Sequence, residues 1–242
     1  MNKIQAKELL HDILNNGVAV DIFQAEQSLC LINLILKNSK EINESTFVIL
    51  FRTLQFILTK EFTLSITKLY EKSDRRYSNR SIPSALKLLN QHAGELVIGE
   101  RYFIIKKLAK YGFDGKYLDG LNDTQITEEI AKYFQNVLLT KLSNGMLSKA
   151  LSALMTARDK VIAHSEAIQT LDLPKTTLEE AEQLLVFAKK FLGVVGMGYL
   201  SIAYEDSDGN HFLSQDAKRV SRAMERLLIK AGIIKQDKPS IP

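Results

Sequence analysis

The chain has 242 residues, of which 45% are hydrophobic and 25% charged, the ordinary balance of a soluble globular protein. With 12 glycines and 4 prolines it holds too few turn residues for a fold of many strands, so long helices are expected. The formal net charge of +4 is mildly basic and compatible with a nucleic-acid partner, while the single cysteine, Cys30, excludes an intrachain disulfide and favours a reducing setting.

The hydropathy of the chain predicts no membrane segment. Residues 1–8 are polar and amphipathic and do not form a signal sequence. A membrane-spanning helix needs roughly 20 apolar residues in a row, and the nearest uncharged run, residues 191–204, is too short. We therefore expect a soluble, cytoplasmic protein that does not associate with a membrane.

The N-terminal third of the chain predicts three helices. Residues 3–15 carry apolar side chains at helical spacing, and the Asn-Asn-Gly sequence at 15–17 predicts that this helix ends there. A second helix over residues 21–36 is crowded enough with apolar side chains to be buried on several sides. Residues 43–70 then predict one helix of about 28 residues as the central strut of the core.

A polar loop and two less regular stretches follow. Residues 72–80 are polar and basic, and Ser81 or Ser84 then caps a helix. Residues 98–111 predict a helix or an irregular segment. The glycines and aspartates of residues 112–120 predict a connecting loop.

The C-terminal half again predicts helices and no repeat. Helical periodicity recurs over residues 122–142, from residue 147 to the polar stretch at 157–166, and over residues 214–231. A capping box formed by Thr176 and Glu179 starts another helix. Residues 198–213 predict either a small hairpin around an Asp-Gly turn or an extended helix end. The whole chain, residues 1–242, is therefore expected to form a single all-α domain.

One short stretch brings Arg158, Asp159 and His164 together at the end of an apolar helix. On an ideal α-helix Arg158 and His164 lie about 9 Å apart along the axis and roughly 120° apart around it, so they occupy different faces. Two copies packed about a two-fold axis would bring an arginine and a histidine from each chain into one cleft. The structural alternative is a helix C-terminus at which His164 favours the helix dipole and Arg158 forms a surface ion pair.

This motif resembles the Arg-x(4–6)-His motif of the HEPN superfamily, small all-helical proteins that include many metal-independent ribonucleases of toxin–antitoxin, abortive-infection and CRISPR systems. Asp159 fits the polar residue that usually follows the arginine in that family. Residues 66–70 and 81–89, on either side of the polar loop, resemble the abortive-infection branch in layout. The resemblance implies a HEPN-like helical bundle over about residues 20–195, with N-terminal additions and a C-terminal extension over about residues 205–242.

The resemblance also implies an activity, a metal-independent endoribonuclease of phage-defence or toxin type that cleaves RNA by attack of the 2′-OH. His164 would act as general base or acid, Arg158 as the phosphate clamp and Asp159 as its support, because histidine titrates near neutral pH and arginine offers a permanently charged fork. A homodimer, an RNA substrate and an antitoxin protein are the implied partners. Two alternatives stay open: a non-catalytic helical module that binds RNA or protein, and a regulatory subunit of a toxin–antitoxin pair.

Further basic residues and one tyrosine suit a groove for single-stranded RNA, because basic side chains pair with phosphates and an aromatic ring stacks on a base. The candidates are Arg75, Arg76, Tyr77 and Arg80 in the polar loop and Lys160 beside the motif. A solvated loop is the alternative. The last helix carries a basic stripe, Arg219, Arg222 and Arg226, which suits phosphate, an acidic partner or simply solvent.

The remaining histidines and the cysteine predict no metal site. His11, His92, His211 and Cys30 show no spacing typical of metal ligands, and no arrangement of a nucleophile with a base can be ordered along the chain. We expect neither a metal nor a cofactor.

Overall fold

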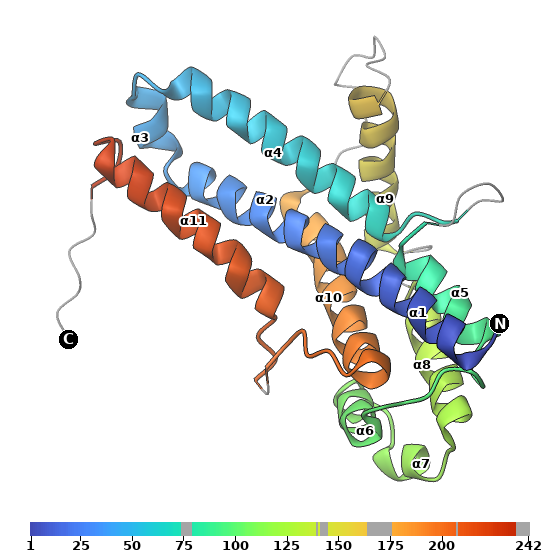
Figure 1. Ribbon diagram of the computed structural model, residues 1–242. Coiled ribbons are helices and arrows are strands. Elements are labelled where there is room, and N and C mark those ends of the chain that lie inside the picture. Colours follow the sequence, from blue (N-terminus) through green and yellow to red (C-terminus); the bar gives the residue numbers. More distant parts are fainter. Residues whose placement is uncertain (74–78, 139, 141–144, 164–175, 207, 236–242) are drawn as a thin grey trace, which may run out of the picture.

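The computed structural model describes residues 1–73, 79–138, 140, 145–163, 176–206 and 208–235, with the backbone alone for Met146 and residues 161–163. These residues form an all-α fold, which confirms the predicted fold class (Figure 1). The helices are packed side by side and crosswise around one hydrophobic core.

The first two predicted helices are one continuous rod. Helix α1 (Lys3–Ile13) passes through a π-helical turn, η1 (Leu14–Val18), into α2 (Ala19–Lys37). The predicted break at residues 15–17 is therefore wrong. Gly17 is buried in η1, where a Cβ atom would lie 2.5 Å from the carbonyl oxygen of Arg80. The glycine allows a neighbouring segment to approach the helix closely and does not end it.

The long helix predicted from Asn43 is shorter than expected. A short helix, α3 (Ser39–Glu44), precedes α4 (Val48–Leu69), and the chain is extended at Ser45 between them. The Ser45 hydroxyl donates a hydrogen bond to the carbonyl oxygen of Ile42 at 2.8 Å and accepts one from the amide of Phe47 at 3.2 Å. Such local side-chain bonds to the backbone compete with helical ones, which explains the interruption.

The middle of the chain follows the prediction more closely. Helix α5 (Ile82–Gln91) is capped by Ser81, one of the two expected caps. Of the alternatives for residues 98–111, a helix is present over Arg101–Lys110 as α6. A short helix, α7 (Gly115–Asp119), lies within the predicted loop. Helix α8 (Asp123–Val137) starts at a capping box of Asn122 with Gln125.

The C-terminal half contains α9 (Met146–Ala157), the π-helical turn η3 (Arg158–Ala163), α10 (Leu178–Leu200) and α11 (Phe212–Lys230). The capping box of α10 lies one residue later than predicted, on Thr177 with Glu180. Neither of the two expectations holds over the whole of residues 198–213, because α10 ends at Leu200. An isolated antiparallel bridge of Glu205 with His211 stands in place of the hairpin among the described residues.

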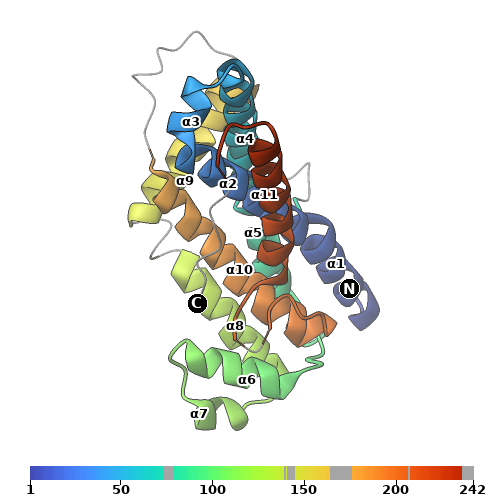
Figure 2. The ribbon, with the colours of Figure 1, turned by 90° about the vertical axis from the view of Figure 1, so that its left-hand side faces the viewer.

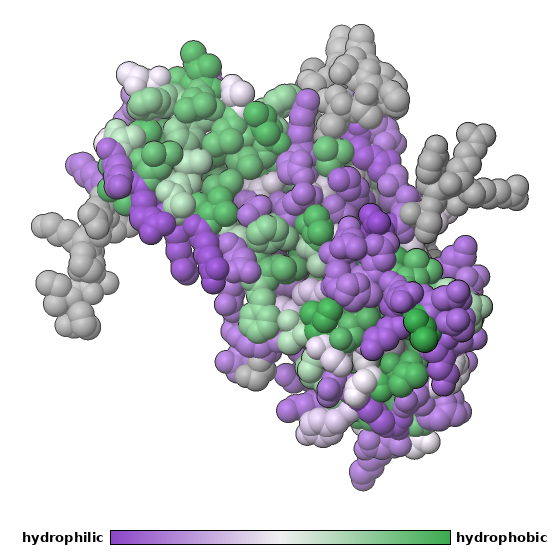
Figure 3. All heavy atoms as spheres, viewed as in Figure 1, coloured by the Kyte–Doolittle hydropathy of each residue, from purple (hydrophilic) through white to green (hydrophobic). Residues whose placement is uncertain are grey.

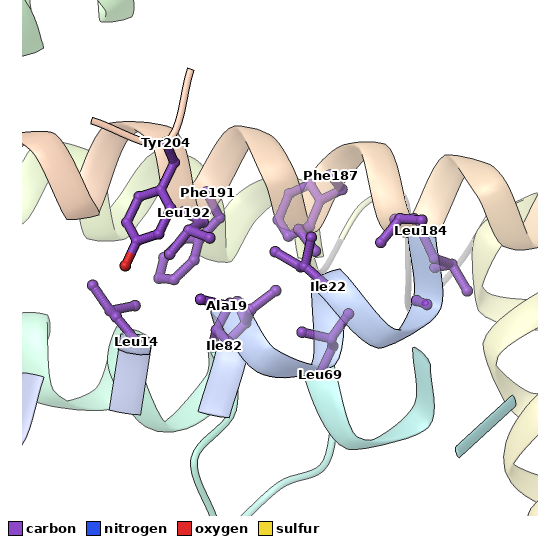
Figure 4. Packing of buried hydrophobic residues seen from close by; sticks show 14 of the residues in the cluster. Leu14, Ala19, Ile22, Leu69, Ile82, Leu184, Phe187, Phe191, Leu192 and Tyr204 are labelled. Carbon is purple, nitrogen blue, oxygen red and sulfur yellow. The ribbon is translucent and has the colours of Figure 1, made fainter. Parts of the chain in front are cut away.

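Three helices form one layer, with α2 lying between α4 and α11 (Figures 1 and 2). Helix α10 crosses behind this layer and contacts α2, α4, α6 and α9. Its buried side chains include Leu184, Phe187 and Phe191, which point toward α2 and the ends of α4 and α5 (Figure 4). A helix that is apolar on several sides is expected in a core, and α10 takes that place.

The glycines near the end of α10 serve close packing. A Cβ atom on Gly196 would overlap the ring of Tyr204, so the helix continues past it and the following chain folds back over it. Ser201, at φ 56°, then ends the helix in the left-handed conformation.

Among the described residues, two helical stretches are long and apolar enough to cross a membrane by length and composition, Lys3–Lys37 and Leu178–Leu200. The prediction from uncharged runs missed them because each stretch contains charged residues. In the fold, 61% and 72% of their most apolar windows are buried. Packing against the rest of the chain therefore accounts for their apolar character, as in the core helices of soluble proteins.

One helix face remains uncovered. Figure 3 shows hydrophobic residues gathered over α4 and its surroundings in the upper left of the view. The exposed large side chains on α4 are Ile49, Leu50, Phe56 and Ile57, of which Ile49 is 77% exposed. We call these four residues the open face of α4. Scattered apolar residues on a surface are ordinary, but a contiguous set of this kind marks an interaction surface.

Candidate functional site

The motif arginine is fixed by two carboxylates. Nε of Arg158 donates a hydrogen bond to Oδ1 of Asp159 at 2.7 Å, and Nη1 donates to Oε1 of Glu71 at 3.1 Å. The arginine side chain is 20% exposed. The hydrogen bond to Asp159 is the main cause that raises the pKa of Arg158, with Glu71 adding to it, so the guanidinium is held both charged and oriented.

Glu71 reaches this position because the end of α4 is anchored at several points. The hydroxyl of Tyr70 donates a hydrogen bond to the carbonyl oxygen of Leu184 on α10 at 2.5 Å, in a buried setting. The hydroxyl of Ser81 donates to the backbone carbonyl of Glu71 at 2.6 Å. These contacts tie the end of α4 to α10 and to the start of α5. The carboxylate of Glu71 thereby lies beside the motif helix although 87 residues separate it from Arg158.

The motif lies on a widened helical turn. Residues Arg158–Ala163 form the π-helical turn η3 directly after α9. Residues 158–163 therefore depart from ideal α-helical geometry, because a π turn has more residues per turn. Such turns are rare and occur often at functional sites.

A cleft of about 1030 Å³ opens beside Arg158, between α5, α8, α9 and the end of α4. Its floor is apolar, with Leu86, Leu138, Leu151 and Met155. Its lining also includes polar and charged side chains, namely Glu71, Lys72, Lys87, Asn90, Gln91, Gln135, Arg158 and Asp159. An apolar floor with a few convergent polar groups is the usual make-up of a ligand site.

Of the predicted RNA-binding residues, Arg80 and Lys160 are described. Lys160 is exposed in η3, next to Asp159. Arg80 does not face the cleft beside Arg158, because its Nε donates to Oδ2 of Asp12 at 2.8 Å. It lines a second cavity of about 640 Å³ together with Asp21 and Lys68, and Glu71 borders both cavities.

Four predicted site residues lie outside the described residues. They are His164 of the motif and Arg75, Arg76 and Tyr77 of the polar loop. Arg158 and Asp159 are brought together, as expected of a supported arginine. The place of His164 relative to them remains a prediction from the sequence.

No group of three or more histidine, cysteine, aspartate or glutamate side chains comes together as a metal site within the part of the chain that the structure describes. Carboxylates do gather around the second cavity, at Asp12, Asp21 and Glu71. Burial raises the pKa of Asp21 to about 6, and Lys68, at 3.9 Å, acts in the opposite direction.

Sequence reasoning missed the residues that surround Arg158. Glu71 lies at the end of α4, Lys87 and Asn90 lie on α5 and Gln135 on α8, and no short spacing connects them to the motif. One weak signal could have pointed to the amides of α5 and α8 as site residues. They are exposed on helices whose other faces are apolar.

A comparison with known protein families supports the resemblance deduced from the motif. The family model HEPN_AbiU2, described as AbiU2, matches residues 24–223, which is most of the chain. No curated protein and no solved structure matches the chain significantly. The matched range includes α4, the cleft, Arg158 and most of α11. The chain therefore belongs to the AbiU2 family of HEPN proteins, in the abortive-infection branch that the layout of residues 66–70 and 81–89 had indicated.

Proposed function

We propose that this protein is a metal-independent endoribonuclease of phage defence, with its active site at the motif helix. Membership of the AbiU2 family links the chain to abortive infection. The observation that carries the proposal is the placement of Arg158, a guanidinium oriented by Asp159 at the wall of a large cleft. Within the described residues no hydrogen bond occupies Nη2 of Arg158, which leaves N–H groups for a phosphate oxygen.

Each motif residue then has one role. His164 takes the proton of the 2′-OH as general base, or donates a proton to the leaving 5′-oxygen as general acid. Arg158 stabilises the negative charge that develops on the phosphate, and Asp159 orients Arg158. A substrate phosphate competes with Glu71 for Nη1 of Arg158, so the ion pair at 3.1 Å opens or is shared when RNA binds.

The active unit in this proposal is a homodimer in the cytoplasm. A second copy that covers the open face of α4 removes from water the apolar side chains that the monomer exposes. Helix α4 also contacts α9 and η3, so the same helix carries the proposed interface and packs against the motif helix. An antitoxin protein remains a further candidate partner.

One observation favours a second candidate function, a non-catalytic helical module that binds RNA or protein. Arg158 is already paired with two carboxylates, which is what a purely structural arginine would show. In that case the motif helix holds the end of α4, and the cleft binds a partner without chemistry. A regulatory subunit of a toxin–antitoxin pair belongs to the same non-catalytic class.

The two candidates differ in one assay. Purified protein is incubated with labelled single-stranded RNA in excess EDTA, alongside the Arg158→Ala and His164→Ala variants. The ribonuclease proposal predicts cleavage by the unmodified chain and a loss of at least about 100-fold in each variant, the scale of a lost general acid–base group. Circular dichroism of each variant verifies that its helices are intact. RNA binding without cleavage by the unmodified chain would support the non-catalytic module.

A further inference from the structure

The cleft beside Arg158 has two chemically different ends, arranged along α5. Lys72 and Arg158 lie toward the start of α5, and Lys87, about one turn before Asn90 on that helix, shares a smaller cavity with Lys72 and Pro83. Asn90 and Gln91 lie at the other end of the same helix, opposite Gln135 of α8. The helix rises about 12 Å between residues 83 and 91.

The first end attracts anions. Three cations and two carboxylates are among its lining residues, and both carboxylates, Glu71 and Asp159, are already engaged by Arg158. Lys72 and Lys87 are exposed, and neither forms an ion pair within the described residues. Two lysines beside a guanidinium therefore remain available for phosphate oxygens.

The second end presents amides to solvent. We call Asn90, Gln91 and Gln135 the amide cluster. All three side chains are exposed, and Nδ2 of Asn90 donates a hydrogen bond to Oε1 of Gln135 at 3.2 Å. Each amide offers two N–H donors and a carbonyl acceptor, so this single contact leaves most of their capacity unused.

Apolar side chains line the same cleft as the cations and the amide cluster. They include Leu86 of α5, Leu138 at the end of α8 and Leu151 of α9. A flat base with a polar edge matches such a surface, because its face contacts carbon while its edge donates to and accepts from amides. Recognition of single-stranded RNA depends on this combination of contacts.

We propose that the amide cluster is a base-recognition subsite for single-stranded RNA, with the adjacent phosphate held by Lys72, Lys87 and Arg158. The inference rests on the proposed function for the nature of the ligand, and it adds a sequence preference to that function. Asn90 and Gln135 read the edge of one base, Gln91 borders it, and the cationic end places the neighbouring phosphate beside the motif.

The test measures binding separately from cleavage. Fluorescence anisotropy is recorded for the full-length His164→Ala protein with labelled six-nucleotide RNAs of A, C or U. A good pair of hydrogen bonds to a base favours the matching base over the others by about 1–3 kcal/mol, which is roughly 5- to 150-fold in affinity. We expect one of the three RNAs to bind at least 5-fold more tightly than the other two.

Variants then assign the preference to residues. Asn90→Ala and Gln135→Ala are expected to reduce the preference below 2-fold while affinity for the two weaker RNAs stays within 2-fold. Lys87→Ala is expected to weaken all three RNAs equally and to make binding less dependent on salt, since it removes a phosphate contact. Gln215→Ala, an exposed amide on α11, is the matched control and should change nothing.

The outcomes separate this inference from the proposed function. Equal binding of the three RNAs, no binding of any, or a preference that survives both amide substitutions would overturn the subsite. RNA cleavage by the unmodified chain together with equal binding would leave the ribonuclease standing and remove the subsite. A base preference that depends on the amides, in a protein that cleaves no RNA, would support the subsite and contradict the ribonuclease.

Discussion

Replacing Gly17 with alanine should destabilise the protein, although the same change stabilises most helices. Gly17 lies in the π-helical turn that joins α1 to α2. An added Cβ atom would lie 2.5 Å from the carbonyl oxygen of Arg80 and would also overlap its Cβ atom. Neither atom belongs to the far end of a flexible side chain, so the backbone at Arg80 has to move.

The size of the effect follows from two opposing contributions. Alanine is favoured over glycine within a helix by up to about 1 kcal/mol. Overpacking against a fixed neighbour costs about 1–3 kcal/mol, and contact with backbone belongs at the upper end of that range. The net loss in the free energy of unfolding is therefore about 1–2 kcal/mol, which corresponds to a Tm lowered by roughly 2–8 °C for a chain of this size.

Thermal unfolding followed by far-UV circular dichroism measures this difference. Gly115→Ala is the matched control, because Gly115 starts α7 and no atom lies within 4 Å of an added Cβ. The control should leave the Tm unchanged or raise it slightly. A Tm for Gly17→Ala that equals or exceeds that of the unmodified protein would refute the argument that this glycine provides space for the segment at Arg80.

Three further predictions follow from burial and charge. Burial lowers the pKa of His211 to about 4, against 6.5 in the unfolded chain. Between these pH values the unfolded chain binds a proton that the folded chain does not, so the free energy of unfolding falls by up to about 3 kcal/mol as the pH drops from 6.5 to 4. His211→Phe should abolish this loss, as measured by chemical denaturation. Burial raises the pKa of Asp21 from 3.8 to about 6, so the buried charge destabilises the folded chain above pH 6. Asp21→Asn should raise the free energy of unfolding at pH 7 by up to about 3 kcal/mol and make stability decrease more steeply as the pH is lowered. Unchanged stability at pH 7 would contradict the burial argument. Phe56→Lys, on the open face of α4, should convert the proposed homodimer to a monomer in light scattering, whereas Ile4→Lys, at an exposed position on α1, should not. A dimer that persists in Phe56→Lys would contradict the proposed interface.

Periodicity of apolar residues predicted most of the helices, because burial of one face determines which residues repeat every three or four positions. Local side-chain chemistry decided the boundaries, and it was predicted less well. Ser81 was one of two predicted caps, whereas the interruption at Ser45 was missed, since a serine before a long helical pattern predicts a cap as readily as a break. The Asn-Asn-Gly sequence predicted a helix end because the contact that requires Gly17 comes from Arg80, far along the chain.

The candidate site divides in the same way. Arg158 and Asp159 are neighbours in sequence, and their pairing could be expected. Glu71 reaches Arg158 through tertiary packing at the end of α4, which no spacing reveals. The π-helical turn at Arg158 also escaped prediction, because its sequence fits an ordinary helix and the turn depends on its surroundings.

The most direct test of the proposed mechanism uses a short RNA with a single 2′-deoxyribose, incubated with the protein in EDTA. The account predicts cleavage after ordinary riboses with 2′,3′-cyclic phosphate ends, no cleavage after the deoxyribose, and loss of cleavage in both Arg158→Ala and His164→Ala. Cleavage after the deoxyribose, or undiminished cleavage when both motif residues are replaced, would contradict it.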